Sequence, residues 1–360
     1  MSTAAKIRIR ATLALLAAAS LALAGCAPQS GPTANPEPTP VYVTAPLTGM
    51  QYLENSVEAA GLSRPSVACK IDNSYDARPQ LGLNRTDVTF VEMVEGGLTR
   101  LVAIWHSDQP NSVGPVRSIR PMDPDIISPF GGIVCYSGGQ WVFMKMMLAT
   151  NVFNASETSE QDNGTFSRTA DRIAPHNVMV YVSKLATNHP ELAAPQVQFG
   201  FANEPTKSTA ALQGKPVSDI KVYFPLAVSQ WAPNADASRF LRTQDGEIHT
   251  DAADGSQISA ANVVIMTVEI DRSYLDGRYG NVPRTVMIGS GQAQVCSAGS
   301  CVAATWSKSS QIAPITFTDA AGNPVLLAPG NTWVELQAAI AESKTVLTFK
   351  PLPSATPTPK

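Results

Sequence analysis

The sequence predicts an α+β fold in which an N-terminal α/β layered domain precedes a mostly antiparallel β domain. Residues 46–205 mix short strand-like runs with stretches of helical apolar spacing. Residues 217–350 are short strand-like runs separated by turn signals, which is typical of antiparallel hairpins. The stretch 203–216 at the junction of these regions is polar and contains two prolines, so we expect a linker over 206–216.

Residues 1–25 predict an export signal that ends at a lipid-anchor cysteine. Lys6, Arg8 and Arg10 precede the apolar run ATLALLAAASLALAG, which is too short for a stable membrane span. The following Leu23-Ala24-Gly25-Cys26 resembles a bacterial lipobox, which implies that Cys26 is acylated and becomes the first mature residue. Its acyl chains would anchor the protein at the extracytoplasmic face of the cell membrane. A cleaved secretory signal with an incidental cysteine is the alternative.

Two proline-rich segments flank the predicted folded part. Residues 26–45 have no apolar periodicity and predict an extended tether, and residues 351–360 predict an unstructured tail. Nine of the 28 prolines lie in these two segments. Removal of residues 1–25 leaves 23 basic and 29 acidic residues, a net charge of −6. This charge argues against a nucleic-acid partner and against a polybasic membrane-binding surface.

Within 46–205, the strand predictions rest on short runs rich in β-branched and aromatic residues. They are VACKID, VTFVEMV, TRLVAIWHS and GIVCYSG. Ser56–Gly61 predicts a short helix, and two later helices are expected over 141–150 and 180–189.

Within 217–350, eight strand-like runs are separated by turn dipeptides such as Asp245-Gly246 and Pro329-Gly330. The runs are IKVYFP, RFLRT, NVVIMTVEI, RTVMIGSG, VAATWSK, ITFTD, PVLLA and TWVEL. We expect Trp306 and Trp333 to fill the core of this β domain.

Four cysteines remain after the anchor, and an even number outside the cytoplasm favours disulfides. Cys296 and Cys301 lie between two strand-like runs, so their disulfide would close the end of a hairpin. Cys69 and Cys135 each lie in an apolar strand, and either a disulfide or two buried free thiols fits that pattern. No second CxxC pair or His cluster supports metal binding by these cysteines.

Residues 78 to 172 contain seven arginines and a single lysine, Lys145. The planar guanidinium binds carboxylate or phosphate through two parallel hydrogen bonds, so this bias indicates an anion site. Structural ion pairs with nearby carboxylates are the alternative. Gly138 and Gly139 follow a strand, where backbone N–H groups can approach an anion closely. The candidate anion-binding residues are Arg78, Arg85, Arg100, Arg117, Arg120, Gly138 and Gly139; Arg168 and Arg172 complete the seven.

Asp72, Asp87 and His176 are the candidate catalytic residues. His176 lies in a polar loop between Pro175 and Asn177, where an imidazole can act as general base or ligand, although a structural role is the alternative. The serines show no G-x-S-x-G elbow, and no H-E-x-x-H motif, Walker loop or EF-hand loop is present, so these residues indicate no firm cofactor or metal.

The sequence resembles the YerB-like bacterial lipoproteins from about Pro46 to Leu336. The resemblance rests on the stretch from Arg64 to Trp105, which includes EGGLTR, and on VGPVRSIRP, CYSGG and APHN. In the second domain it rests on NVVIMTV, GSGQAQV, TWSKSS and PGNTWVEL. It implies an envelope lipoprotein with an α/β domain followed by a β domain, and it implies no activity.

Asp87 before a strand, arginines at strand ends, and Tyr136 with Gly138-Gly139 are also similar to features of the LytR-CpsA-Psr phosphotransferases. That similarity implies that Arg85, Arg100, Arg117 and Arg120 hold a lipid pyrophosphate while Asp72 or Asp87 holds Mg²⁺. The sequence departs from those enzymes in two respects. No Arg-Asp pair follows Ser118-Ile119, and no long apolar tract for a polyprenyl chain is present.

Two functions of different class follow. The first is a non-enzymatic envelope lipoprotein that binds an anionic wall component or a partner protein through its Arg-rich domain. The second is a metal-assisted transferase or hydrolase that acts on envelope glycopolymers or their lipid-pyrophosphate precursors. The second function predicts that Arg100, Arg117, Asp72 and His176 converge on one site.

Overall fold

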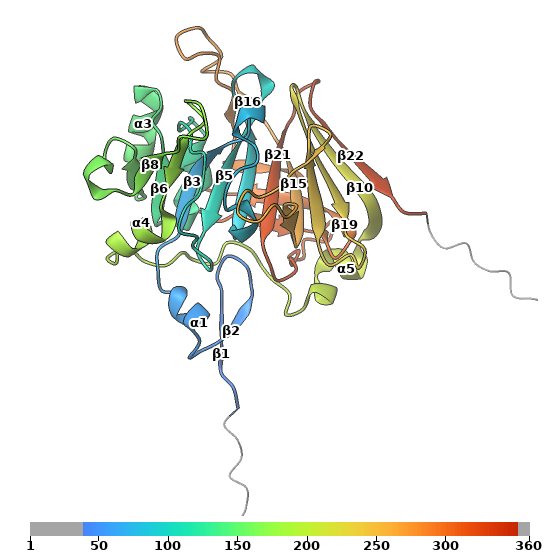
Figure 1. Ribbon diagram of the computed structural model, residues 1–360. Coiled ribbons are helices and arrows are strands. Elements are labelled where there is room, and N and C mark those ends of the chain that lie inside the picture. The colour runs from blue at the N-terminus through green and yellow to red at the C-terminus, as the bar shows by residue number, and fades with distance from the viewer. Residues whose placement is uncertain (1–38, 352–360) are drawn as a thin grey trace, which may run out of the picture. The chain divides into compact units, whose positions relative to one another are not determined.

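The computed structural model describes residues 39–351, and most of its regular structure is β-strand. Thirteen strands follow one another in a mixed sheet, and three more pair at its sides. The few helices lie outside this sheet, as Figure 1 shows. This arrangement confirms the predicted α+β class. The lipid-anchor prediction at Cys26 and the tail prediction beyond residue 351 lie outside the described residues.

The first half of the chain builds one end of the sheet in the order β4-β5-β3-β6-β7. The first three strands are antiparallel neighbours, whereas β6 and β7 continue parallel to β3. β3, β4 and β5 are buried along their full length, which explains their nearly continuous apolar sequences. Their bounds are β3 (Val67–Asp72), β4 (Val88–Met93), β5 (Thr99–Trp105), β6 (Ile133–Tyr136) and β7 (Phe153–Ser156).

The second half is mostly antiparallel, as predicted, and the predicted Asp245-Gly246 turn connects β12 to β13. Tyr223 pairs with Val228 across the β10–β11 turn, and Cys296 pairs with Cys301 across the β18–β19 turn. The bounds are β10 (Lys215–Phe224), β11 (Ala227–Pro233), β12 (Phe240–Gln244), β13 (Glu247–Ile248), β14 (Ser259–Ala260), β15 (Asn262–Val268), β18 (Gly289–Ser297), β19 (Ser300–Lys308), β20 (Thr316–Thr318), β21 (Thr332–Ala338) and β22 (Lys344–Phe349).

A single strand pairing connects the sheet regions of the two halves. β21 pairs in parallel with β15 on one side and with β4 on the other, with Thr332 opposite Val88. Every residue of β21 is buried, as expected for a central strand covered on both faces. Each of the two hydrophobic core clusters also contains residues from both halves, for example Val91 with Trp231 and Phe90 with Phe317. The sheet and its core are therefore continuous through the chain.

Three of the helices match the sequence predictions. α1 (Val57–Gly61) begins after Ser56, whose hydroxyl accepts the Ala59 N–H as an N-cap. α3 (Trp141–Leu148) and α4 (Val182–Asn188) occupy the two later helical stretches. The other helical segments are α2 (Asp123–Ile127), α5 (Thr209–Gln213), η1 (Tyr75–Ala77), η2 (Leu83–Arg85), η3 (Glu95–Gly97), η4 (Ser128–Phe130), η5 (Gln161–Asn163) and η6 (Pro205–Lys207).

Three short sheets lie apart from the large one. They are β1 (Tyr42–Thr44) with β2 (Gln51–Leu53), β8 (Phe166–Arg168) with β9 (Val178–Val180), and β16 (Ile270–Asp271) with β17 (Arg284–Thr285). β1 lies within the predicted tether, where Tyr42-Val43-Thr44 is a short β-prone run. α5 lies within the predicted linker, where Ser208 caps it. Both segments therefore have local structure that their proline content obscured.

Both cysteine pairs form disulfides in the structure. Cys69 in β3 and Cys135 in β6 are directly paired across parallel strands, with their Cα atoms 4.5 Å apart. Cys296 and Cys301 face each other at the end of the β18–β19 hairpin, with Cα atoms 4.0 Å apart. Trp306 and Trp333 are buried in the two core clusters, as predicted.

Candidate anion-binding site

Charged side chains gather along the edge of the sheet that is formed by strand ends. Here the last residues of β3, β4 and β6 lie beside the first residues of β5. This edge is opposite to the one near α1, β1 and β2 in Figure 1. Asp72 is the last residue of β3 and pairs in register with Arg100 of β5. Glu92 of β4 pairs with Arg100 from the other side. The strand register therefore places one arginine between two carboxylate residues.

The segment 115–120 brings two more arginines to this edge. The Asp72 N–H donates to the Pro115 carbonyl at 2.9 Å, and the Arg117 N–H donates to the Lys70 carbonyl at 2.8 Å. On its other side, the Ile119 N–H donates to the Gly138 carbonyl at 2.9 Å. The segment thus lies between the end of β3 and the loop that follows β6, and this position fixes the backbone of Arg117 and Arg120.

Of the three arginines at this edge, Arg117 and Arg120 have carboxylate partners and Arg100 has none among the residues described. Arg117 Nε lies 3.2 Å from Asp72 Oδ2. Arg120 makes a two-pronged contact with Glu95, at 2.9 Å from Nε and 2.8 Å from Nη2. We call Arg100, Arg117 and Arg120 the arginine cluster.

Arg100 differs from the other two. Its Nη1 donates to the Ser118 carbonyl at 3.3 Å, and no carboxylate lies within ion-pair distance of it in the described part of the chain. It is 8% exposed. Burial, followed by the charges of Arg120 and Arg117, lowers the pKa of Arg100 to about 10. The guanidinium therefore stays charged at neutral pH, and an anion beside it would be favoured.

Asp72 and His176 form a hydrogen-bonded pair beside the cluster. His176 Nδ1 lies 2.7 Å from Asp72 Oδ2 and 3.3 Å from the Ser74 hydroxyl. Burial alone would raise the pKa of Asp72, but hydrogen bonds from the Ser74 N–H and His176 and the charge of Arg117 outweigh it, so this pKa is lowered. Asp72 is therefore an anion at neutral pH, and it holds the imidazole through Nδ1.

Three fully buried charged side chains, Lys70, Glu92 and Asp123, adjoin the arginine cluster. Lys70 Nζ contacts Glu92 and lies 2.7 Å from Asp123 Oδ1. Burial raises the pKa of Glu92, and the charge of Asp123 adds to this effect, while Lys70 opposes it. Asp123 also accepts the backbone N–H of Arg120. This buried group therefore helps to fix the position of Arg120.

The structure brings together Arg100, Arg117, Arg120, Asp72 and His176, whereas the remaining candidate arginines and Asp87 have other partners. Arg85 and Asp87 lie just before β4, at the opposite edge of the sheet, where Arg85 pairs with Asp108. Arg78 pairs with Asp245 and Arg168 with Glu157, while Arg172 donates to the Ala77 carbonyl at 2.7 Å.

The two glycines lie against the segment that carries Arg117 and Arg120, and the anion contact by their N–H groups stays a prediction. Gly138 contributes its carbonyl, which accepts the Ile119 N–H. A Cβ at Gly139 would lie 2.7 Å from Ile119 Cγ2, so glycine allows the loop to approach the segment between Arg117 and Arg120. The glycines therefore position the arginines in this structure.

The residues at this edge do not fit a Mg²⁺ site. Mg²⁺ requires oxygen ligands, and both carboxylate oxygens of Asp72 already accept N–H groups or face Arg117. Among residues 39–351, no group of three or more His, Cys, Asp or Glu side chains has an arrangement that could hold a metal ion. Within the same residues, no helix is sufficiently long and apolar to cross a membrane.

Sequence reasoning missed the network that connects this edge to the second half of the chain. Arg242 contacts His249 Nδ1 at 2.5 Å, and His249 Nε2 lies 2.6 Å from Gln80 Oε1. Gln80 in turn donates to the Asp72 carbonyl at 2.7 Å. Since Gln80 and His249 are 169 positions apart and show no local motif, the sequence carries no signal for their contact.

Residues 47–194 match the family model described as the N-terminal domain of a protein of unknown function (DUF3048), and residues 220–334 match its C-terminal domain. The chain is 25% identical over 308 residues to a protein of Bacillus subtilis (strain 168) whose printed name is "Putative lipoprotein YerB". That alignment covers 81% of this chain and 85% of YerB. The crystal structure of YerB is similar in fold, with a TM-score of 0.70 and 21% identity over 84% of this chain and 99% of that one.

Proposed function

This chain belongs to the YerB-like family, and on that premise we propose that it is a lipid-anchored envelope protein that binds an anionic envelope component through the arginine cluster. The envelope location is supported by the lipobox-like sequence at Cys26 and by the name of its relative YerB. Cys26 would attach the protein to the extracytoplasmic face of the cell membrane, with residues 26–45 as a tether.

We include the predicted division into domains in this proposal. The two family matches, 47–194 and 220–334, lie on either side of 206–216, which supports an N-terminal α/β domain over 46–205 and a β-rich domain over 217–350. The arginine cluster belongs to the first of these.

The observation that carries the binding proposal is the unpaired state of Arg100 within the described residues. Arg117 and Arg120 pair with Asp72 and Glu95, whereas Arg100 makes no ion pair with a carboxylate among these residues. An anion beside Arg100 would supply the ion-pair partner that this side chain lacks, and a guanidinium can hold a carboxylate or phosphate through two hydrogen bonds. A phosphate- or carboxylate-bearing wall polymer has this chemistry.

A pull-down with isolated wall glycopolymer and with muropeptide tests the proposal. We expect Arg117→Ala/Arg120→Ala to abolish capture, because the variant loses two of the three guanidinium groups. Arg85→Ala/Arg168→Ala is the matched control, since it removes two arginines outside the cluster. Arg100→Lys keeps the charge without the planar fork and should weaken binding less than Arg100→Gln. Equal capture by the cluster variant and the control would refute the proposal.

The Asp72–His176 pair supports a second function, a transferase or hydrolase for the same polymers or their lipid-pyrophosphate precursors. With Nδ1 held by Asp72, Nε2 of His176 is the nitrogen that can accept a proton from an attacking hydroxyl or water. Incubation with geranyl pyrophosphate tests this function. We expect His176→Gln to abolish phosphate release and to leave pyrophosphate binding unchanged. Binding without any release by the unaltered protein would exclude this function and leave the first one standing.

A further inference from the structure

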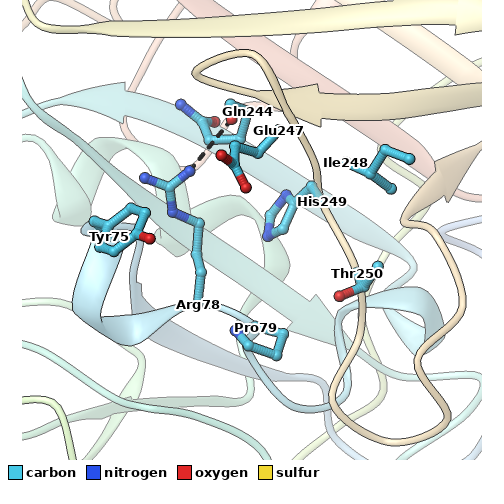
Figure 2. Close-up of a pocket in the computed structure, with 8 residues that line it drawn as sticks. All are labelled: Tyr75, Arg78, Pro79, Gln244, Glu247, Ile248, His249 and Thr250. Carbon is cyan, nitrogen blue, oxygen red and sulfur yellow. Dashed lines mark hydrogen bonds between the residues drawn. The ribbon is translucent and has the colours of Figure 1, made fainter.

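A separate cavity of about 220 Å³ lies between η1 and the β12–β13 hairpin. Figure 2 shows Tyr75 and Arg78 on one side and Glu247 and His249 on the other. Its walls thus come from both halves of the chain. No residue of the arginine cluster lines it.

Part of the lining is fixed by hydrogen bonds. Gln244 is buried, and its side-chain oxygen accepts from Arg242 at 2.6 Å and from Asn73 at 3.3 Å. His249 is buried between Arg242 and Gln80. Burial and the charges of Arg242 and Arg78 lower the pKa of His249 well below its usual value, so the imidazole is neutral. The Gln244 amide and the neutral His249 imidazole thus form this wall, and the charged Arg242 lies behind them.

The arginine in the lining is already occupied. Arg78 Nη2 lies 2.9 Å from Asp245 Oδ2, its Nη1 donates to the Gln244 carbonyl at 3.4 Å, and its Nε donates to the Ser74 carbonyl at 3.3 Å. Each of its three nitrogens therefore has a partner. An anionic ligand would have to compete with Asp245 for this guanidinium.

The carboxylate in the lining has no such partner. Glu247 is exposed, and no Lys, Arg or His of the described residues forms an ion pair with it. In Figure 2 its carboxylate points to the same side as Arg78 and His249. Because Arg78 is paired with Asp245, Glu247 is the charged side chain of the lining that has no ion-pair partner among the described residues.

An aromatic surface completes the cavity. Tyr75 is 75% exposed, and the Arg78 guanidinium lies 5.7 Å from the centre of its ring. Pro79 adds an apolar contact. The volume is below the roughly 300–1,000 Å³ of sites for drug-sized ligands, so the occupant is a small group.

We propose that this cavity binds a primary ammonium group on a short apolar stem, as in a lysine side chain or a peptide N-terminus. The ammonium would pair with Glu247, and the stem would pack on Tyr75 and Pro79. This site is independent of the anion-binding proposal, because it uses different residues and a ligand group of opposite charge.

Calorimetric titration of the full chain tests this site with three probes. They are Nα-acetyl-lysine methylamide, its Nε-acetylated form, and glycine amide, which offers only an N-terminal amine. We expect the lysine probe to bind, and we expect Nε-acetylation or Glu247→Gln to weaken its binding by about tenfold or more, as for loss of a charged hydrogen bond. Glu54→Gln is the matched control, since Glu54 is exposed and does not line the cavity. Comparison with glycine amide distinguishes a side-chain amine from a chain terminus.

The proposal is overturned if neither amine probe binds, or if Glu247→Gln and Glu54→Gln bind the lysine probe equally well. Pyrophosphate binding, measured on the same Glu247→Gln sample, should equal that of the unaltered protein. That control separates failure of this site from failure of the arginine cluster or of the fold.

Discussion

At the residue scale, charged side chains buried beneath the arginine cluster have the largest expected effect on stability. Lys70→Met would leave Glu92 and Asp123 without their shared cation, and breaking a buried pair in this way costs about 3–5 kcal/mol. Urea denaturation measures this loss of unfolding free energy. Lys145→Met removes an exposed lysine and serves as control. Lys70→Met/Glu92→Gln should recover part of the loss, and an unchanged midpoint for Lys70→Met would contradict the role of Lys70.

The raised pKa of Asp87 predicts that the stability of the folded protein depends on pH. Burial raises the pKa of Asp87 to about 6, although the His106 and Ser107 N–H groups and the Ser107 hydroxyl oppose this. The folded protein therefore binds the proton more tightly than the unfolded chain, so stability falls as the pH rises from about 4 to about 6. The shift corresponds to about 3 kcal/mol. Asp87→Asn should remove this loss. The free energy of unfolding, measured by denaturation at pH 4 and at pH 6.5, should therefore decrease less for the variant than for the unaltered protein. Equal decreases would contradict the raised pKa.

At the element scale, the two disulfides should contribute unequally. Cys69–Cys135 spans 66 residues and Cys296–Cys301 spans 5. Loop-closure entropy gives about 4 kcal/mol for the first and about 2 kcal/mol for the second. Thermal unfolding of the two double Cys→Ser variants should therefore show the larger destabilisation for Cys69/Cys135. The opposite order would show that loop entropy does not dominate here.

The sequence predicted elements whose signals are local. The helices at Val57–Gly61 and Trp141–Leu148, and the hairpin closed by Cys296 and Cys301, follow from apolar spacing, an N-cap and turn residues. Arginine enrichment indicated the site, although three of the seven arginines, and not all of them, gather there. The three meet because Arg100 lies in β5 while Arg117 and Arg120 lie in a segment against β3. The Gln80–His249 contact depends on long-range pairing that no local pattern encodes.

At the scale of the whole molecule, the parallel pairing of β21 with β4 makes the two halves depend on each other. A fragment of residues 40–214 would expose the β4 edge and the core side chains that contact the second half. We expect this fragment to lack dispersed amide resonances in NMR spectra and to regain them when residues 215–351 are co-expressed. A fragment that folds alone with cooperative unfolding would show that the shared sheet is not required.

The central claim is that an anion binds at Arg100, Arg117 and Arg120. It is tested most directly by following the arginine Nε–Hε resonances of the full chain during titration with pyrophosphate. We predict saturable shifts for these three arginines, with Arg85 and Arg168 unchanged. Shifts of similar size at all five arginines, or none at Arg100, would contradict the account.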